Sequence, residues 1–205
     1  MTPGSEIGLR IDQTLTQDAT GTMAWLQFEA LGIPRVKTDI SLSYVDHNTL
    51  QMNFRNPDDH RFLRTVAAKF GGVYSGPGTG ICHQLHLENF AKPGATLVGS
   101  DSHTRYGALG TMAIGEGGGE LAKQLLGRTY DVARPGVVAI YLTGSLPAGC
   151  GPHDVAIALV GKLFKSGYVK NKVMEFVGPG IASLRQDTRN AIDAMTTETT
   201  CLSSI

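Results

Sequence analysis

Two acid–histidine pairs are the groups in this sequence best suited to move protons. They are Asp46-His47 and Asp101-Ser102-His103. A carboxylate beside an imidazole fixes its tautomer and raises its basicity, so such a pair suits general acid catalysis on a leaving hydroxyl group. A single pair is more often a capping or loop hydrogen-bond group. Because two such pairs occur in similar positions, we give the catalytic interpretation about the same weight as the capping interpretation.

Both pairs follow segments that predict β-strands. Residues 40–46 (ISLSYVD) alternate apolar and polar side chains, and residues 95–99 (ATLVG) form a short apolar run. In open parallel sheets, ligands bind outside the carboxyl ends of the strands. We therefore expect both pairs to lie where a ligand binds.

The other histidines divide into two groups. His83 and His86 lie in or beside a glycine-rich segment, residues 73–84, which we expect to be mainly loop, and they are further candidates for a site. His60 follows two aspartates and is expected to be a solvated residue at the start of a helix. His153 is expected to be only a neighbour of a helix cap.

Glycines and cysteines give weaker signals. Residues 115–119 (GEGGG) could cradle a phosphate at a helix N-terminus, but they match neither dinucleotide-binding nor P-loop spacing, so close backbone packing is the better interpretation. The three cysteines are far apart in the sequence and odd in number: Cys82, Cys150 and Cys201. Their spacing fits no zinc or cluster signature. We expect buried, inert thiols and no metal ligand in this chain.

The remaining pattern alternates strands with helices, which predicts an α/β fold with a mostly parallel sheet. The predicted helices cover residues 18–32, 59–70, 120–127, 154–163 and 183–195. Further strands are predicted at residues 137–142 and 174–177. A soft boundary at Arg134-Pro135-Gly136 divides the chain into a first α/β domain, residues 1–135, and the start of a second, residues 136–205. We expect this second domain to be incomplete at Ile205.

Composition limits the class of protein. The 205 residues include 18 Lys+Arg and 18 Asp+Glu, so the formal net charge is zero, and 41% of residues are hydrophobic. These values argue against disorder and against nucleic-acid binding driven by bulk charge. The sequence has no apolar run long enough for a membrane span and no leader pattern in its first residues. With the unpaired cysteines, this predicts a cytoplasmic protein.

Several short blocks resemble those of the aconitase family, and they occur in the same order. The stronger blocks are Thr16-Gln17-Asp18-Ala19-Thr20, Tyr44-Val45-Asp46-His47-Asn48, Gly80-Ile81-Cys82-His83-Gln84 and Gly99-Ser100-Asp101-Ser102-His103-Thr104. Weaker ones are Ala113-Ile114-Gly115 with Gly117-Gly118, Leu142-Thr143-Gly144 and Gly178-Pro179-Gly180. The resemblance covers essentially the whole chain.

The resemblance implies a three-layer α/β/α fold and a hydro-lyase built around a [4Fe–4S] cluster. The implied substrate is a hydroxy tricarboxylic acid, citrate or isocitrate, interconverted through cis-aconitate. The family's cluster cysteines and its serine base belong to later parts of the sequence, so we expect the remaining domains in cis or in a separate subunit, and no activity from these 205 residues alone. Homoaconitase, 3-isopropylmalate dehydratase and a non-catalytic RNA-binding protein of this family remain alternatives.

The resemblance also assigns roles residue by residue. Asp46 and His47 correspond to the pair that protonates the leaving hydroxyl, and Gln17 and Ser102 to contacts with a substrate carboxylate. The shell around the iron-bound water is implied to comprise Asp101, His103, His83 and Glu198. Departures from the family pattern put substrate choice in doubt; they are Arg105, Tyr106, Gly151-Pro152-His153 and Ala194.

Overall fold

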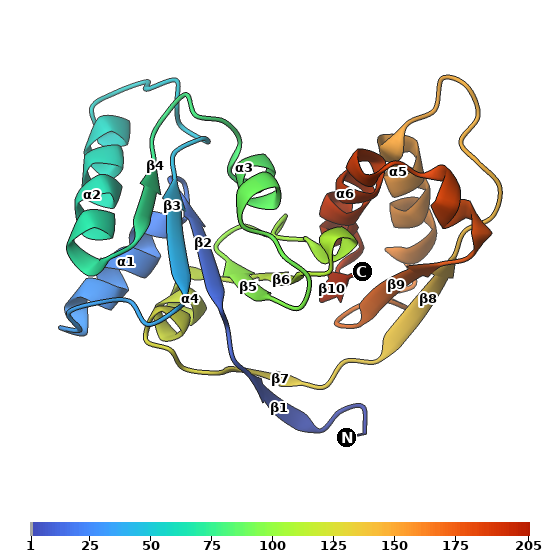
Figure 1. Ribbon diagram of the computed structural model, residues 1–205, viewed down its shortest axis with the longest axis horizontal. Coiled ribbons are helices and arrows are strands. Elements are labelled where there is room, and N and C mark those ends of the chain that lie inside the picture. The colour runs from blue at the N-terminus through green and yellow to red at the C-terminus, as the bar shows by residue number, and fades with distance from the viewer. Residues whose placement is uncertain (1) are drawn as a thin grey trace.

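The computed structural model describes residues 2–205 and has an α/β architecture, as predicted (Figure 1). The helices are α1 (Gly21–Ala30), α2 (Arg55–Phe70), α3 (Cys82–Asn89), α4 (Gly118–Leu125), α5 (Pro152–Leu163) and α6 (Gln186–Met195). Three short 3-10 helices are η1 (Gly107–Leu109), η2 (Pro179–Ser183) and η3 (Thr196–Thr199). The strands are β1 (Glu6–Leu9), β2 (Gln13–Gln17), β3 (Ile40–Tyr44), β4 (Val73–Ser75), β5 (Thr96–Gly99), β6 (Met112–Gly115), β7 (Tyr130–Ala133), β8 (Val137–Tyr141), β9 (Val173–Val177) and β10 (Ser203–Ser204).

The main sheet has five parallel strands in the order β4-β3-β2-β5-β6. The chain builds outward from β2 through β3 to β4 and then returns to the other side of β2 with β5. The strand order therefore reverses between β2 and β5, which is the place where open α/β sheets bind ligands.

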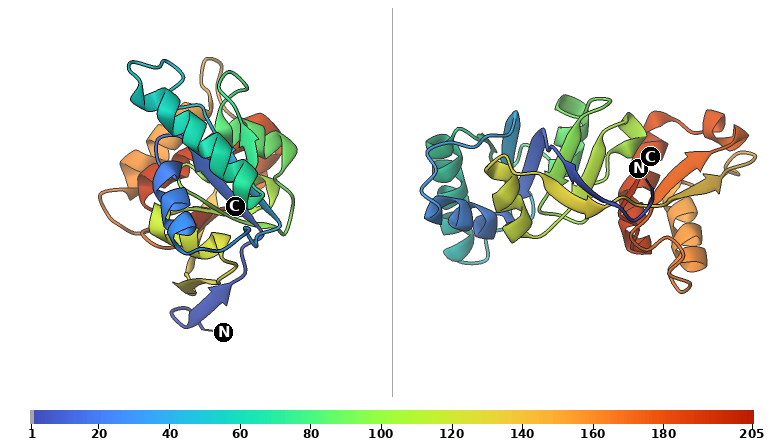
Figure 2. Two further views of the ribbon diagram at one scale, coloured as in Figure 1. Left: turned by 90° about the vertical axis from the view of Figure 1, so that its left-hand side faces the viewer. Right: turned by 90° about the horizontal axis from the view of Figure 1, so that it is seen from below.

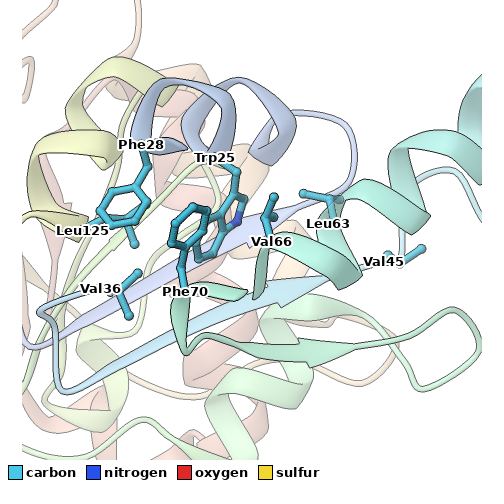
Figure 3. Close-up of a cluster of buried hydrophobic side chains, with 8 residues drawn as sticks. All are labelled: Trp25, Phe28, Val36, Val45, Leu63, Val66, Phe70 and Leu125. Carbon is cyan, nitrogen blue, oxygen red and sulfur yellow. The ribbon is translucent and has the colours of Figure 1, made fainter. Parts of the chain in front are cut away.

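Helices cover both faces of this sheet and complete three layers. On one face, α1 and α2 meet through the stacked rings of Trp25 and Phe70, whose centroids are 6.5 Å apart (Figure 3). Leu125 of α4 joins the same cluster. On the opposite face, α3 packs Leu85 against a cluster that includes Leu42. These buried apolar clusters hold the strand ends in fixed positions.

A second, smaller sheet lies at the other end of the molecule, in the order β10-β9-β8, and its strands are parallel. It packs with α5 through a cluster of buried residues around Met174 and Leu163. An antiparallel ribbon, β1 with β7, runs between the two sheets (Figure 2). Among the helices of residues 2–205, none has the length and apolar character that a membrane span requires.

The elements differ from the predictions in a few places. Strand β2 lies immediately before the helix predicted at residues 18–32 and was not predicted, because its only large apolar side chain is Leu15. Helix α3 occupies part of a segment that was predicted to be mainly loop. Strand β4 lies in that same segment. Strands β1, β6, β7 and β10 were also not predicted, since each has at most four residues and too few alternations to show a pattern.

Close backbone packing explains part of the glycine-rich segment, as predicted. A Cβ atom on Gly115 would lie 2.3 Å from the carbonyl oxygen of Asp101, and one on Gly118 would lie 3.2 Å from the backbone nitrogen of Ala24. Gly115 therefore lets the loop after β5 lie directly against β6.

Candidate active site

Three neighbouring strands end at the edge of the main sheet where the strand order reverses. Strand β3 leads into Asp46-His47, and β5 leads into Asp101-Ser102-His103. Strand β2 lies between them and ends at Gln17. Parallel strands present their carboxyl ends at one edge, so three separate segments meet there, as the sequence predicted for the two pairs.

The carboxylate of Asp101 is the centre of this site. Its Oδ1 atom lies 3.2 Å from Nε2 of His83 and 3.3 Å from Nδ1 of His103. Its Oδ2 atom lies 3.4 Å from Nε2 of His47. The backbone N–H of His103 also donates to Oδ1, at 2.7 Å. The structure thus brings the three predicted imidazoles around one carboxylate.

The charges of this group reinforce one another. The adjacent imidazoles of His103 and His83, together with the hydrogen bond from the backbone N–H of His103, hold the pKa of Asp101 far below its ordinary value. In return, the hydrogen bond to Asp101 raises the pKa of His103, although partial burial opposes the shift. Asp101 is therefore a fixed negative charge that favours protonated imidazoles next to it.

The Asp46-His47 pair is hydrogen-bonded and partly open to solvent. Nδ1 of His47 donates to Oδ1 of Asp46 at 2.8 Å, and the His47 side chain is 38% exposed. Partial burial opposes a charge on His47, but the hydrogen bond and charge of Asp46, with further help from Asp101, raise its pKa. The pair can therefore store a proton beside a surface that a small molecule can reach.

Asp18 fixes the backbone of that pair, a function that the sequence did not reveal. Its Oδ1 atom accepts the N–H groups of Asp46 and His47 at 3.0 and 2.9 Å, and its Oδ2 atom accepts that of Asn48 at 2.8 Å. Burial disfavours the charged carboxylate, but these three hydrogen bonds lower the pKa of Asp18. The sequence did not reveal this function, because strand β2 was not recognised.

His60 and His86 differ from their predicted settings. His60 was expected to be solvated, but it is only 6% exposed, and its Nε2 atom lies 3.2 Å from Oδ2 of Asp18. His86 was a site candidate, but it is a core residue of α3 that bonds to Tyr44 and Gln13. Burial lowers the pKa of His86 to about 4. Sequence spacing could not distinguish these buried histidines from the exposed ones.

The predicted substrate contacts lie beside Asp101. The Gln17 side chain is buried, and its Nε2 donates to Oδ2 of Asp101 at 3.3 Å. Its Oε1 accepts the N–H of Ala19 at 2.5 Å. Ser102 is exposed next to Asp101 in the same loop. Ser102 is thus accessible to a ligand, whereas Gln17 would have to exchange a partner to contact one.

Glu198 reaches the site from the smaller sheet's part of the chain. It lies in η3, and its Oε1 atom is 3.3 Å from Nε2 of His103. Residues about a hundred positions apart in the sequence therefore meet at one imidazole. All of the predicted catalytic residues gather at this edge of the main sheet.

Tyr106, noted in the sequence as a departure from the family pattern, contacts the site directly. Its buried hydroxyl lies 2.8 Å from Nδ1 of His83. Burial raises the pKa of Tyr106 well above its ordinary value, so the phenol stays protonated and keeps its hydrogen bond with Nδ1 of His83. That contact orients the ring so that Nε2 of His83 faces Asp101.

The family model for the aconitase family (aconitate hydratase) matches residues 2–205. The chain belongs to the aconitase family. The mitochondrial aconitate hydratase of Schizosaccharomyces pombe is 36% identical over 191 residues, and that of Saccharomyces cerevisiae is 34% identical over 188 residues. These matches cover 88% and 86% of this chain but only 24% of each relative. The chain thus spans about a quarter of the length of these aconitate hydratases.

The prediction of a cytoplasmic location was wrong by this comparison. The relatives in S. pombe, Candida albicans and S. cerevisiae are all named as mitochondrial proteins. The prediction depended on the absence of a leader pattern and of a disulfide pattern. The absence of a disulfide pattern indicates a reducing environment and does not distinguish the mitochondrial matrix from the cytoplasm.

The thiols of this aconitase-family chain do not form a cluster site. Cys82 and Cys201 belong to different buried clusters, at the main and the smaller sheet respectively, and Cys150 is exposed in a loop. Burial, with the charge of Asp46 next in importance, raises the pKa of Cys82, so that thiol stays protonated. A [4Fe–4S] cluster needs several thiolates at one point, and the described residues do not supply them.

The imidazoles nevertheless suit a bound oxygen group. Nε2 of His83 is buried and has no aligned hydrogen-bond partner among residues 2–205, although Asp101 lies within ion-pair distance. A buried polar atom without an aligned partner is costly. The site therefore accommodates an additional acceptor, such as a water or hydroxyl oxygen, beside Asp101.

Proposed function

We propose that this chain supplies the acid–histidine part of the active site of a hydro-lyase that dehydrates and rehydrates a hydroxy tricarboxylic acid. The substrate pair we propose is citrate and isocitrate, interconverted through cis-aconitate. The observation that carries this proposal is the position of Asp101 among three imidazoles at the strand ends. Loss of a β-hydroxyl requires an acid for the departing oxygen, and this site holds several acids.

In this proposal, the Asp46-His47 pair delivers the proton to the leaving hydroxyl. Its imidazole has a raised pKa and is partly exposed, so it can be protonated near neutral pH and reach a ligand. Asp101, His83, His103 and Glu198 hold the released water by hydrogen bonds. Gln17 and Ser102 contact a carboxylate of the substrate.

The proposal requires a cofactor whose protein ligands lie outside the described residues. A bound [4Fe–4S] cluster would supply a Lewis-acidic iron that polarises the carbon–oxygen bond. This chain contributes the surrounding carboxylate and imidazoles, and the remaining aconitase domains would come in cis or from a separate subunit. We also propose that residues 1–135 and 136–205 belong to two successive domains.

A related hydro-lyase activity is the second candidate. Arg105 and Tyr106 depart from the family pattern, and the Tyr106 hydroxyl contacts His83. A change so close to the site favours testing other hydroxy acids, such as homocitrate or 3-isopropylmalate. No specific observation favours RNA binding, and the formal net charge of zero argues against it.

The proposal is tested with a protein that contains this chain and the remaining family domains. The cluster is reconstituted with iron and sulfide under anaerobic conditions, and the ultraviolet absorbance of the alkene product is followed. We expect turnover of isocitrate and citrate, and slower turnover of homocitrate and 3-isopropylmalate. A fully loaded protein that dehydrates none of the four acids would overturn the proposal.

A further inference from the structure

Three side chains of different donor type converge at the proposed proton-donating pair, which contributes two of them. One ligand atom from each of Asp46, His47 and Cys82 lies within 4.8 Å of the others. They are a carboxylate oxygen, an imidazole nitrogen and a thiol sulfur. Two come from the loop after β3, and the third is the first residue of α3.

The backbone on both sides of this group is held in place. Oδ2 of Asp46 accepts the N–H of Cys82 at 2.6 Å, which joins the loop after β3 to the start of α3. The carboxylate of Asp18 accepts hydrogen bonds from the N–H groups of Asp46 and His47. The Cys82 side chain is fully buried, whereas the His47 side chain is 38% exposed and leaves an access path.

We propose that Asp46, His47 and Cys82 form a binding site for a divalent transition metal ion of the Zn²⁺ type. Thiolate, imidazole and carboxylate together suit Zn²⁺ or Co²⁺ and disfavour Mg²⁺ and Ca²⁺, which prefer oxygen ligands. Three protein ligands leave a fourth tetrahedral position for water. On binding, a metal–sulfur bond forms and the thiol proton is released to solvent.

The site has a consequence for activity, and this part depends on the proposed function. A metal ion held by Asp46 and His47 removes the lone pairs that would otherwise carry the proton for the leaving hydroxyl. Metal binding at this site therefore inhibits dehydration. The metal binding itself can be measured without substrate or cluster.

The experiment uses Co²⁺ as the probe on this 205-residue chain, whose three thiols are Cys82, Cys150 and Cys201, after circular dichroism has shown that it is folded, and with a reducing agent that contains no thiol. Coordination by Cys82 produces a sulfur-to-cobalt charge-transfer band in the near ultraviolet, and excess Zn²⁺ abolishes it. We expect Cys82→Ser to lose the band and to bind Zn²⁺ at least ~100-fold more weakly, since even the loss of an outer partner weakens binding by ~10- to 100-fold. The matched controls, Cys150→Ser and Cys201→Ser, keep the band.

The site is overturned if the unchanged protein binds no Co²⁺, or binds it without a charge-transfer band. It is also overturned if the band persists in Cys82→Ser. If Cys82→Ser unfolds by circular dichroism, His47→Gln replaces it, and an unchanged Zn²⁺ affinity in that variant also refutes the site. None of these results depends on turnover, so failure of the metal site and failure of the proposed hydro-lyase are separable.

Discussion

At the scale of single residues, Asp101 determines how the site behaves. One carboxylate contacts the imidazoles of His47, His83 and His103 and the amide of Gln17. Its pKa is far below the ordinary value, so it keeps its charge at any pH at which the protein works. The imidazoles therefore share one permanent counter-charge, which couples their protonation.

Replacing Asp18 tests whether its hydrogen bonds fix the backbone of residues 46–48. We expect Asp18→Asn to lower stability by about 1–3 kcal/mol, since the amide cannot accept all the hydrogen bonds that the buried carboxylate accepts. We also expect the backbone amide resonances of Asp46, His47 and Asn48 to shift together. Asp39→Asn, at an exposed ion pair with Arg10, is the control and changes stability little. Unshifted amides in Asp18→Asn would contradict this function of Asp18.

Tyr106 tests the orientation of His83. Tyr106→Phe removes the hydroxyl that hydrogen-bonds to Nδ1 of His83, so this contact no longer orients the ring. We expect the cluster-loaded enzyme to lose about tenfold in kcat, a smaller effect than the ~10²- to 10⁴-fold due to a proton-transfer group. The ¹⁵N shift of Nδ1 of His83 should change, because its hydrogen-bond partner is removed. Unchanged His83 shifts would show that another contact fixes the ring.

At the scale of elements, glycines allow the loop after β5 to approach its neighbours closely. In Gly115→Ala the new Cβ would meet the carbonyl oxygen of Asp101 at 2.3 Å and Cα of Ser102 at 2.7 Å. We expect a loss of about 1–3 kcal/mol in stability, typical of overpacking, and lower activity because the Asp101 loop must move. Thermal unfolding and turnover measure the two effects.

The control for this substitution lies two residues further along. A Cβ on Gly117 meets no atom within 4 Å, and this residue has an ordinary φ of −75°. We expect Gly117→Ala to cost less than about 1 kcal/mol, the usual effect at a helix N-cap. If both alanine variants lose stability equally, close approach at Gly115 is not the cause.

The sequence predicts elements well where apolar periodicity is strong. The strands at 40–46 and 137–142 and the helix at 59–70 correspond to β3, β8 and α2. Strand β2 was missed because its buried side chains are mostly polar: Thr14 bonds to Ser41, and Thr16 to the carbonyl of Leu42. Tertiary contacts satisfy these hydroxyls, and local pattern cannot show that.

The sequence could predict the acidic and histidine residues of the site, but not the residues that hold them in position. The two acid–histidine pairs follow recognisable strands, so their convergence follows from parallel topology. Asp18 and Tyr106 act through contacts with residues far away in the sequence. Those contacts depend on the packing of β2 and α3, which the sequence pattern did not predict.

At the scale of the whole molecule, the two sheets meet next to the site. Glu198 contacts His103, and the carboxylate of the buried Asp193 accepts the N–H of Ala108 in η1 at 3.0 Å. Arg105 donates to the carbonyl of Cys201 at 3.1 Å. The smaller part of the chain thus braces the loop after β5 from one side (Figure 1).

Global stability should depend on pH through the buried His86. Its pKa is about 4 in the folded chain against 6.5 in the absence of burial, so between these values the unfolded chain binds the proton first. The neutral His86 makes its full contribution to the unfolding free energy above pH 6.5, and this contribution is lost as the pH falls to 4. The change amounts to about 3 kcal/mol. Chemical denaturation at several pH values measures it.

The pH dependence of stability is compared with that of the His86→Gln variant, because the glutamine side chain does not titrate. Other acidic groups also lose stabilisation as the pH falls, but they do so in both proteins. We therefore expect the variant to be less stable at pH 7 and its stability to fall less steeply between pH 6.5 and 4. Parallel pH profiles for the two proteins would contradict a neutral, buried His86.

The most direct test of the central claim is the turnover of isocitrate by Asp101→Asn in the cluster-loaded protein that contains this chain. Asp187→Asn, which changes an exposed carboxylate in α6, is the matched control. If Asp101 organises the proton-transfer groups, kcat falls by about 100-fold or more, while cluster absorbance stays unchanged and circular dichroism shows that the variant is folded. Full activity in Asp101→Asn with an intact cluster would contradict the account.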